Sequence, residues 1–244
     1  MFAGIGTILN ISTIILGGAF GVFIGAKISE RLRGLILDAL GCITLISAAD
    51  ALMDFWNPTF QNSMPKGWPL LIVVFSLVIG AVIGSWWRIE DRLEKFGETL
   101  KKRFAKDGDS NFIEGFVTSS LIFVIGPLAI LGSISDGMGT GIDQLVLKST
   151  LDGFAAMAFA ATFGWGVALS CVPVGIYQFG WTLIGVFLGA ILSDYQILAM
   201  TAVGGILLIG ISLRLLRIKS IEIGNLLPAL ALAPLLALAA HQFI

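Results

Sequence analysis

Long apolar runs follow one another along almost the whole chain, separated by short polar segments and by glycine or proline. Each run is close to the roughly 20 residues that a helix needs to cross a hydrocarbon core about 30 Å thick. The pattern therefore predicts eight membrane-spanning helices. The predicted spans are 4–26, 33–54, 68–87, 113–135, 145–169, 174–193, 195–213 and 223–242.

Composition points the same way. Hydrophobic residues make up 57% of the chain and charged residues 13%, and the mean hydropathy is +0.95. An ordinary soluble domain is roughly 45–50% apolar and about 25% charged. The expected fold class is all-α, a polytopic transmembrane helical bundle with the lipid bilayer as its partner. A secreted soluble domain and a nucleic-acid-binding protein are excluded.

The basic residues predict a topology. Thirteen of the fifteen Lys and Arg residues fall in three clusters, which follow the first, third and seventh spans. Lys and Arg in short loops are retained on the cytoplasmic side. Eight spans with both termini outside place all three clusters on that side, and seven spans remain the alternative. The clusters are Lys27, Arg31 and Arg33; the seven basic residues from Arg88 to Lys106; and Arg214, Arg217 and Lys219.

One strongly charged segment, 88–111, separates a first membrane half, 1–87, from a second membrane part, 112–244. Its apolar residues recur at helical spacing and leave Lys and Arg on the opposite face. That pattern is typical of an amphipathic helix lying on an anionic inner leaflet. The segment is interpreted as a cytoplasmic basic linker, and a regulatory or docking role remains open.

The chain also contains an internal repeat. The hexapeptide GVFIGA at 21–26 recurs as GVFLGA at 185–190, an offset of 164 residues. In the eight-span topology the two copies run in opposite directions, as in the inverted repeats of secondary transporters. Alternatively, the Gly-x-x-x-Gly spacing serves only to let helices pack closely. The packing glycines concerned are Gly21, Gly25, Gly185 and Gly189.

The run 126–153 is unusually polar and rich in glycine for a membrane protein. Gly126 and Pro127 interrupt an apolar span, and proline removes a backbone donor and breaks or kinks a helix. Freed carbonyl groups at that depth must be satisfied by protein or water. The break is followed by three glycines that are candidate hinge residues: Gly137, Gly139 and Gly141.

Lys148 and Asp152 are four residues apart, so on a helix they share a face and can neutralise each other. A charge near the bilayer centre costs at least about 2.5–3.5 kcal/mol, so such a pair requires an explanation. It could bind a solute carboxylate or ammonium group, or carry a proton. A structural ion pair reaching toward the interface explains it equally well.

These features lead to the hypothesis of a small-solute or ion transporter or channel, working as a homo-oligomer. The rival is a non-transporting membrane scaffold or sensor that acts through the surface segment 88–106. No zinc-protease or serine-hydrolase motif is present and His241 is the single histidine, so no catalytic residue, metal site or cofactor is expected. The candidate path residues are Asn10, Ser133, Ser135, Asp136, Lys148, Ser149, Asp152 and Gln178.

Several of these motifs also resemble those of a known family. They are the run from Gly126 to Gly137, Lys148-Ser149 with Leu151-Asp152-Gly153, Tyr177-Gln178, the opening Gly6-Thr7 with Asn10, and the closing Asn225 with Pro228. The sequence resembles the YdfK/YqgA family of bacterial polytopic membrane proteins over nearly its whole length, but 88–111 matches no family pattern. The resemblance implies a bacterial inner (plasma) membrane location and a transport role. It supplies no substrate, mechanism or site residue.

Overall fold

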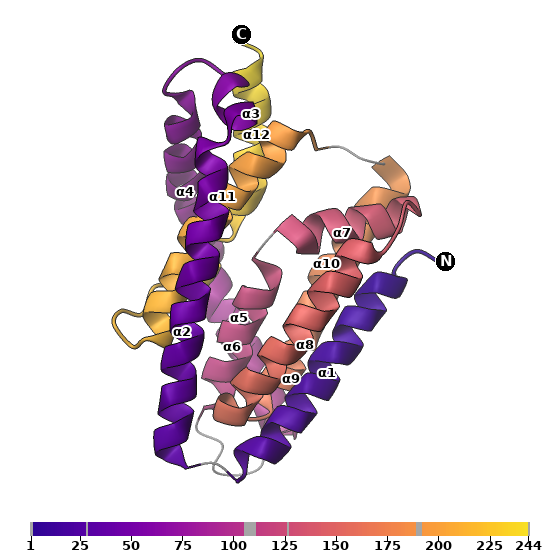
Figure 1. Cartoon of the computed structure of the whole chain (residues 1–244), viewed down its shortest axis with the longest axis vertical. Coiled ribbons are helices and arrows are strands. Elements are labelled where there is room, and N and C mark those ends of the chain that lie inside the picture. Colours follow the sequence, from indigo (N-terminus) through magenta and orange to yellow (C-terminus); the bar gives the residue numbers. More distant parts are fainter. Residues whose placement is uncertain (1, 28, 105–110, 126, 189–191, 244) are drawn as a thin grey trace. The chain divides into compact units, whose positions relative to one another are not determined.

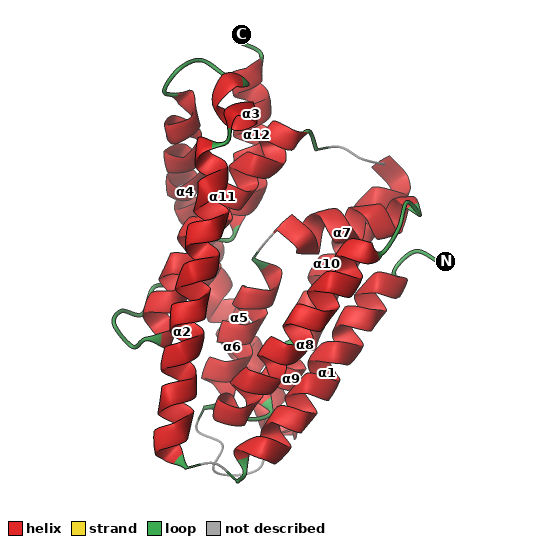
Figure 2. Ribbon diagram, in the orientation of Figure 1, coloured by secondary structure: helices red, strands yellow, loops and turns green. Residues whose placement is uncertain are grey.

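Helices make up all the regular structure of the described residues (Figures 1 and 2). The computed structural model describes residues 2–27, 29–104, 111–125, 127–188 and 192–243. Seven helices in these ranges are long and apolar enough to cross a membrane, and a bent helix pair raises the number to eight. Each corresponds to one of the predicted spans. The prediction of an all-α polytopic membrane protein is confirmed.

The chain folds into two compact units. Unit 1 comprises Met1–Asp38 and Leu93–Ile191, and unit 2 comprises Ala39–Arg92 and Leu192–Ile244. The unit boundaries fall inside α2 (Glu30–Met53) and α5 (Ile89–Phe104). The division into 1–87, 88–111 and 112–244 therefore follows the order of the chain, whereas the packing interleaves segments from both ends of it.

Unit 1 is built on two pairs of closely packed helices. Its elements besides the parts of α2 and α5 are α1 (Ile5–Gly25), α6 (Phe112–Val124), α7 (Pro127–Met138), α8 (Asp143–Phe163), α9 (Gly166–Leu169) and α10 (Cys171–Leu188). α1 runs along α8, and α7 packs on α10 (Figure 1). α1 also contacts α10, which brings helices from the start and the end of the unit together.

Glycine makes the close packing of α1 on α8 possible. Gly17, Gly21 and Gly25 are buried and follow one another at intervals of four residues, which places them on one face of α1. A β-carbon at any of the three would overlap a backbone carbonyl oxygen of α8. Those oxygens belong to Gly153, Met157 and Ala161, respectively. The backbones are therefore closer than any larger residue permits, as the Gly-x-x-x-Gly spacing predicts.

The pairing of α7 with α10 uses glycine in the same way. Gly185 on α10 faces the carbonyl oxygen of Ile134, and Gly137 on α7 faces that of Thr182. Gly137, expected to be a hinge, thus lies inside a helix and serves its packing. The other two expected hinge glycines, Gly139 (φ +72°) and Gly141 (φ +149°), adopt backbone conformations that disfavour other residues in the turn after α7. Gly126 and Gly189 lie outside the described residues.

The predicted interruption of the fourth span separates α6 from α7. α6 ends at Val124, Ile125 is extended, and α7 begins at Pro127. The two helix axes differ in direction by 62°. Proline fits the first turn of a helix because the backbone donor it lacks would have no partner there. The chain therefore changes direction within one apolar stretch.

Unit 2 contains the remaining apolar helices. Its elements besides the parts of α2 and α5 are η1 (Asp54–Trp56), α3 (Pro58–Asn62), α4 (Trp68–Trp87), α11 (Asp194–Leu215), η2 (Ile223–Leu226) and α12 (Pro228–His241). α12 packs against both α4 and α11. Gly80 and Gly84 of α4 lie against the backbone at Ala229 and Asn225. Close glycine contacts therefore organise this unit as well.

A buried carboxylate joins three segments of unit 2. Glu90, at the start of α5, is 4% exposed. Its Oε1 accepts a hydrogen bond from Arg214 Nη1 at 2.6 Å, and its Oε2 accepts one from the Gly224 amide at 2.6 Å. The Glu90 amide donates to Asn225 Oδ1 at 3.1 Å. Glu90 thus links α5 to the end of α11 and to η2.

The charged segment forms the predicted helix over Ile89–Phe104, while 105–110 lie outside the described residues. The part from Leu93 onward belongs to unit 1. There the Phe96 ring meets the Phe116 ring edge-on, with centroids 5.9 Å apart, and Gly97 is buried against Phe116. This helix therefore contacts α6 through Phe96 and Gly97.

The first testable prediction concerns the contact of α1 with α8. Gly21→Ala should lower the free energy of unfolding by about 1–3 kcal/mol, because the added methyl group overlaps the Met157 carbonyl and the helices must separate. Gly180→Ala is the matched control, since a β-carbon there meets nothing within 4 Å. Thermal unfolding of both variants in mild detergent measures the difference. Equal stability of the two variants would contradict the packing described.

The second prediction concerns Glu90. Glu90→Ala should destabilise the protein by about 3–5 kcal/mol, because it leaves the partly buried Arg214 guanidinium without this carboxylate. Asp91→Ala is the control, since its ion pair with Arg88 is exposed and such pairs contribute about 0–1 kcal/mol. Denaturant unfolding monitored by tryptophan fluorescence distinguishes the two. A loss as small for Glu90→Ala as for Asp91→Ala would refute the role assigned to Glu90.

Candidate functional site

Four of the predicted path residues meet in the interior of unit 1. Lys148 Nζ donates to Asp152 Oδ2 at 2.7 Å, and Asn10 Nδ2 donates to the same oxygen at 3.0 Å. Asn10 Nδ2 also lies 3.3 Å from Gln178 Oε1. The four side chains come from α1, α8 and α10 and form one continuous hydrogen-bonded group. We call Asn10, Lys148, Asp152 and Gln178 the polar cluster.

The helix packing determines which side chains meet. Lys148 and Asp152 share a face of α8 because they are four residues apart. Asn10 lies seven residues before Gly17, on the same buried face of α1 that contacts α8. The close approach at Gly17 and the glycines beyond it therefore brings the short Asn10 side chain within reach of Asp152. Gln178 comes from α10, which contacts α1.

The ion pair in the cluster is buried. The side chains of Lys148 and Asp152 are only 8% and 10% exposed, and Asn10 and Gln178 are fully buried. Removing two charges from water is costly, and their mutual attraction offsets this only when the geometry is good and hydrogen bonds support it. The 2.7 Å contact and the additional donor from Asn10 meet that condition. Asp152 accepts two hydrogen bonds on one oxygen.

The cluster retains unused hydrogen-bonding capacity. Asn10 Oδ1, Gln178 Nε2 and the nearby Thr7 Oγ1 are buried and have no hydrogen-bond partner among the described residues. Within the same residues, Asp152 is the only acceptor for the Lys148 ammonium group, which can donate three hydrogen bonds. Buried polar groups are normally satisfied, so several unsatisfied ones in one place are a functional signal.

Asp136 occupies a different position, at the start of α1. It is 3% exposed, and its Oδ2 accepts a hydrogen bond from the Gly6 amide at 3.0 Å. The first amides of a helix lack partners within it, and the helix N-terminus carries partial positive charge. Asp136 therefore supplies α1 with a capping carboxylate from α7. The Gly6 amide that Asp136 accepts from lies on α1, one helical turn before Asn10 of the polar cluster.

The predicted serines do not enter the cluster. Ser133 Oγ donates to the Ala129 carbonyl at 2.7 Å, and Ser149 Oγ donates to the Leu145 carbonyl at 2.5 Å. Both bonds are the local back-bonding that hydroxyl side chains commonly form in helices. Ser135 is partly exposed near the end of α7.

Thr7 is a buried polar residue of this region that belongs to the family motif but is not among the predicted path residues. Its side chain is fully buried and its hydroxyl group lacks a partner in the described part of the chain. Thr7 and Asn10 are three residues apart and therefore share a face of α1. The spacing could have indicated Thr7, because a polar residue three positions from Asn10 lies on the same face of α1.

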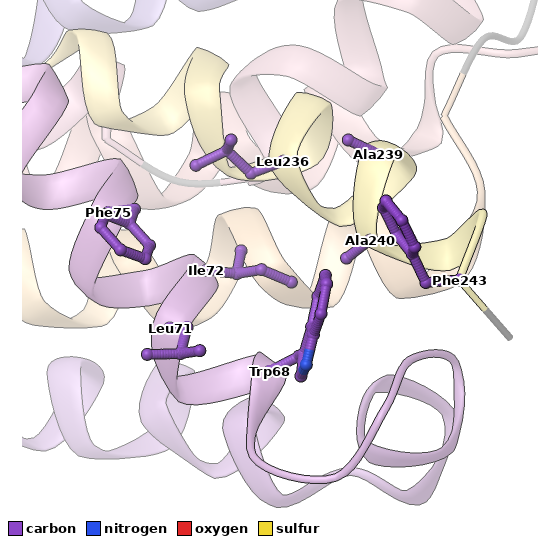
Figure 3. A pocket seen from close by; sticks show the side chains of 8 residues that line it. All are labelled: Trp68, Leu71, Ile72, Phe75, Leu236, Ala239, Ala240 and Phe243. Carbon is purple, nitrogen blue, oxygen red and sulfur yellow. The ribbon is translucent and has the colours of Figure 1, made fainter.

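Two surface pockets lie in the described part of the chain, and the side chains of the polar cluster line neither of them. A pocket of about 240 Å³ between α4 and α12 is lined by apolar side chains (Figure 3). Trp68 and Phe243 close one end of it, with ring centroids 5.3 Å apart. A groove between α1 and α8 includes Ser149 and Gly153, which adjoin Lys148 and Asp152 in sequence. The apolar pocket offers no groups for a polar solute, and the groove is lined by Ser149 and Gly153 but not by Lys148 or Asp152.

A metal site is not evident in the ranges that the structure describes. No three His, Cys, Asp or Glu side chains there are grouped so that they could hold an ion. The charged chemistry of unit 1's interior therefore rests on Lys148, Asp152 and Asp136. Lys148 donates to the Asp152 carboxylate, which also accepts from the Asn10 amide side chain, and Asp136 accepts from a backbone amide.

The third prediction tests the coupling of Lys148 to Asp152. Asp152→Asn should cost about 3–5 kcal/mol of unfolding free energy, because it leaves a buried ammonium group without a countercharge. Lys148→Met combined with Asp152→Asn should recover most of that loss, since no buried charge then remains at the pair. Denaturant unfolding of both variants gives the comparison. A double variant no more stable than the single one would mean that the two charges are not coupled.

Comparisons with known proteins agree with the membrane fold. Residues 5–238 match the family described as "Protein of unknown function (DUF554)", which includes the segment 88–111. "Uncharacterized membrane protein YdfK" of Bacillus subtilis (strain 168) is 30% identical over 238 residues, covering 98% of this chain and 97% of that protein. "Uncharacterized protein YqgA" of Escherichia coli (strain K12) is 27% identical over 233 residues, 94% of each chain. No solved structure matches the chain.

The match extends from α1 into α12, so it includes every helix that contributes to the polar cluster. The resemblance to the YdfK/YqgA family is confirmed. The apolar helices and the similarity to YdfK together show that the chain is a membrane protein. This polytopic helical protein belongs to the DUF554 family.

Proposed function

We propose that the protein is a transporter or channel for a small solute or ion, and that the solute passes through the polar cluster of unit 1. The observation that carries the proposal is the cluster itself. It combines a buried ion pair with two buried amide side chains, inside helices long enough to span a membrane. Ionisable residues within spans are rare and commonly line substrate or proton pathways.

A purely structural role accounts less well for this arrangement. A buried ion pair contributes little net stability, and apolar side chains of similar volume often do as well. Its stabilising value therefore does not explain unpartnered atoms on Asn10, Gln178 and Thr7. Polar groups that must exchange protein contacts for contacts with a solute would have unused capacity when no solute is bound.

The interruption between α6 and α7 also supports transport. Broken helices in transporters expose backbone groups near the solute site and let a segment move. Here the 62° bend lies before α7, which carries Asp136 and packs on α10. The turn at Gly139 and Gly141 links α7 to α8, the helix of the ion pair. Movement of α7 would therefore act on α10, which carries Gln178, and on α8, which carries Lys148 and Asp152.

We further propose that the internal repeat is an inverted one. The two copies of the hexapeptide begin on α1 and on α10, at the equivalent residues Gly21 and Gly185. Each lies against a backbone carbonyl of another helix: Met157 for Gly21 and Ile134 for Gly185. Equivalent glycines therefore make equivalent contacts. In an eight-span chain α1 and α10 run in opposite directions, which is the arrangement of inverted-repeat transporters.

The proposed setting is the inner (plasma) membrane of a bacterium. The three basic clusters would face the cytoplasm and both termini would lie outside. A homo-oligomer is proposed because eight helices of this length leave only a narrow path within one protomer. No catalytic step is part of this proposal.

The fourth prediction is a flux measurement. Purified protein in liposomes should move at least one solute from a panel of ions, amino acids and organic acids. Lys148→Ala combined with Asp152→Asn should reduce that flux at least tenfold in folded protein, because it removes both charges of the path. Uptake of labelled solute and electrical current are recorded side by side.

Lys95→Glu combined with Lys102→Glu is the control. Both lysines are exposed on α5, outside the cluster, and their reversal should leave flux unchanged. No flux for any solute from folded, inserted protein would overturn the proposal. A phenotype lost in the α5 variant and kept in the cluster variant would favour the scaffold or sensor alternative.

A further inference from the structure

The unpartnered groups of the polar cluster include both donors and acceptors. Gln178 Nε2 is a buried donor without a partner, and the Lys148 ammonium group donates only to Asp152. Asn10 Oδ1 is a buried acceptor without a partner, and the Thr7 hydroxyl group can also accept. None of these groups has a further partner in the part of the chain that the structure describes. A ligand that satisfies the region must therefore offer acceptor oxygens on one side and N–H or O–H donors on the other.

The orientation of the two amide groups follows from the network. Asn10 must direct its nitrogen at Asp152, because the carboxylate can only accept. Gln178 then directs its oxygen at the Asn10 nitrogen. This leaves the Asn10 oxygen and the Gln178 nitrogen as the unused atoms. The contact of Asn10 with the Asp152 carboxylate thus fixes which acceptor and which donor remain unmet.

The charges of the cluster already balance. Lys148 and Asp152 form a one-to-one pair, and the third buried charge, Asp136, is held by the Gly6 amide at the positive end of α1. A ligand with net charge would introduce a buried charge without a counterion, which is costly. A ligand with equal positive and negative charge would not.

Space around the cluster is restricted. A β-carbon at Gly6 would lie 2.5 Å from Leu145 Cδ1, and Gly17 lies directly against the Gly153 carbonyl. The helices that carry the cluster are therefore close together on both sides of Asn10. This packing excludes a bulky ligand.

From these observations, and on the basis of the transport proposal above, we infer that the polar cluster binds a small zwitterionic amino acid of the size of glycine or alanine. Its carboxylate accepts hydrogen bonds from Lys148 Nζ and Gln178 Nε2. Its ammonium group donates to Asn10 Oδ1 and Thr7 Oγ1. All four groups are thereby satisfied, and the net charge of the site does not change.

The fifth prediction compares glycine with its two halves. Glycine and alanine should bind purified protein, measured by calorimetry and by a rise in melting temperature. Acetate has the carboxylate without the ammonium group, and methylamine has the cationic amine without the carboxylate. Each should bind at least tenfold more weakly than glycine, because each satisfies one side of the site and introduces an uncompensated charge.

Two variants of α10 locate the binding site. Gln178→Leu should weaken glycine binding at least tenfold, because it removes the buried donor while nearly keeping the side-chain volume. Thr182→Val is the matched control, because its buried hydroxyl group donates to the Gln178 carbonyl one turn away and is already satisfied. It should bind glycine as the parent protein does. Equal loss in both variants would refute the role of the Gln178 side chain.

The same solutes in liposomes distinguish this inference from the transport proposal. Flux of glycine that Gln178→Leu abolishes supports both. Flux of an ion, of acetate or of methylamine without binding of glycine overturns the zwitterion inference and leaves transport standing. No binding and no flux for any solute overturns both.

Discussion

The close contact between α1 and α8 is the constraint on which the interior of unit 1 depends. Glycines on α1 bring its backbone against carbonyl groups of α8, so the two helices are nearer than larger side chains allow. At that separation the short side chain of Asn10 reaches the carboxylate of Asp152. The packing of α1 on α8 therefore brings the polar groups of this unit together.

The buried charges of the two units differ in character. In unit 2, Glu90 is bonded to Arg214, to the Gly224 amide and through its own amide to Asn225, so its carboxylate and backbone are held by α11 and η2. In unit 1, the polar cluster has donors and acceptors that remain unpartnered among the described residues. A satisfied network stabilises one conformation, whereas unsatisfied buried groups are costly unless another molecule completes them. This contrast is the reason for locating the solute site in unit 1.

Much of the fold could be predicted from the sequence, because long apolar runs leave few alternatives to spanning helices. The Lys148–Asp152 pair could be predicted equally well, because the two residues are only four positions apart on one helix. Which other residues join it depends on tertiary packing, so the contacts with Asn10 and Gln178 could not be derived from position along the chain. The Glu90–Arg214 pair joins residues 124 positions apart, and Glu90 lies in a run of exposed charges that gave no indication of burial.

The most direct test of the central claim is the accessibility of Thr7 to water-soluble reagents. Thr7→Cys, in a background with Cys42 and Cys171 replaced by serine, is treated with a membrane-impermeant thiol reagent. Leu16→Cys is the control, because Leu16 is an exposed apolar residue of α1. The account predicts that the reagent modifies the cysteine at position 7, spares the one at position 16 and blocks flux. A cysteine at position 7 that stays unmodified from both sides of the membrane during active transport would contradict a path through the polar cluster.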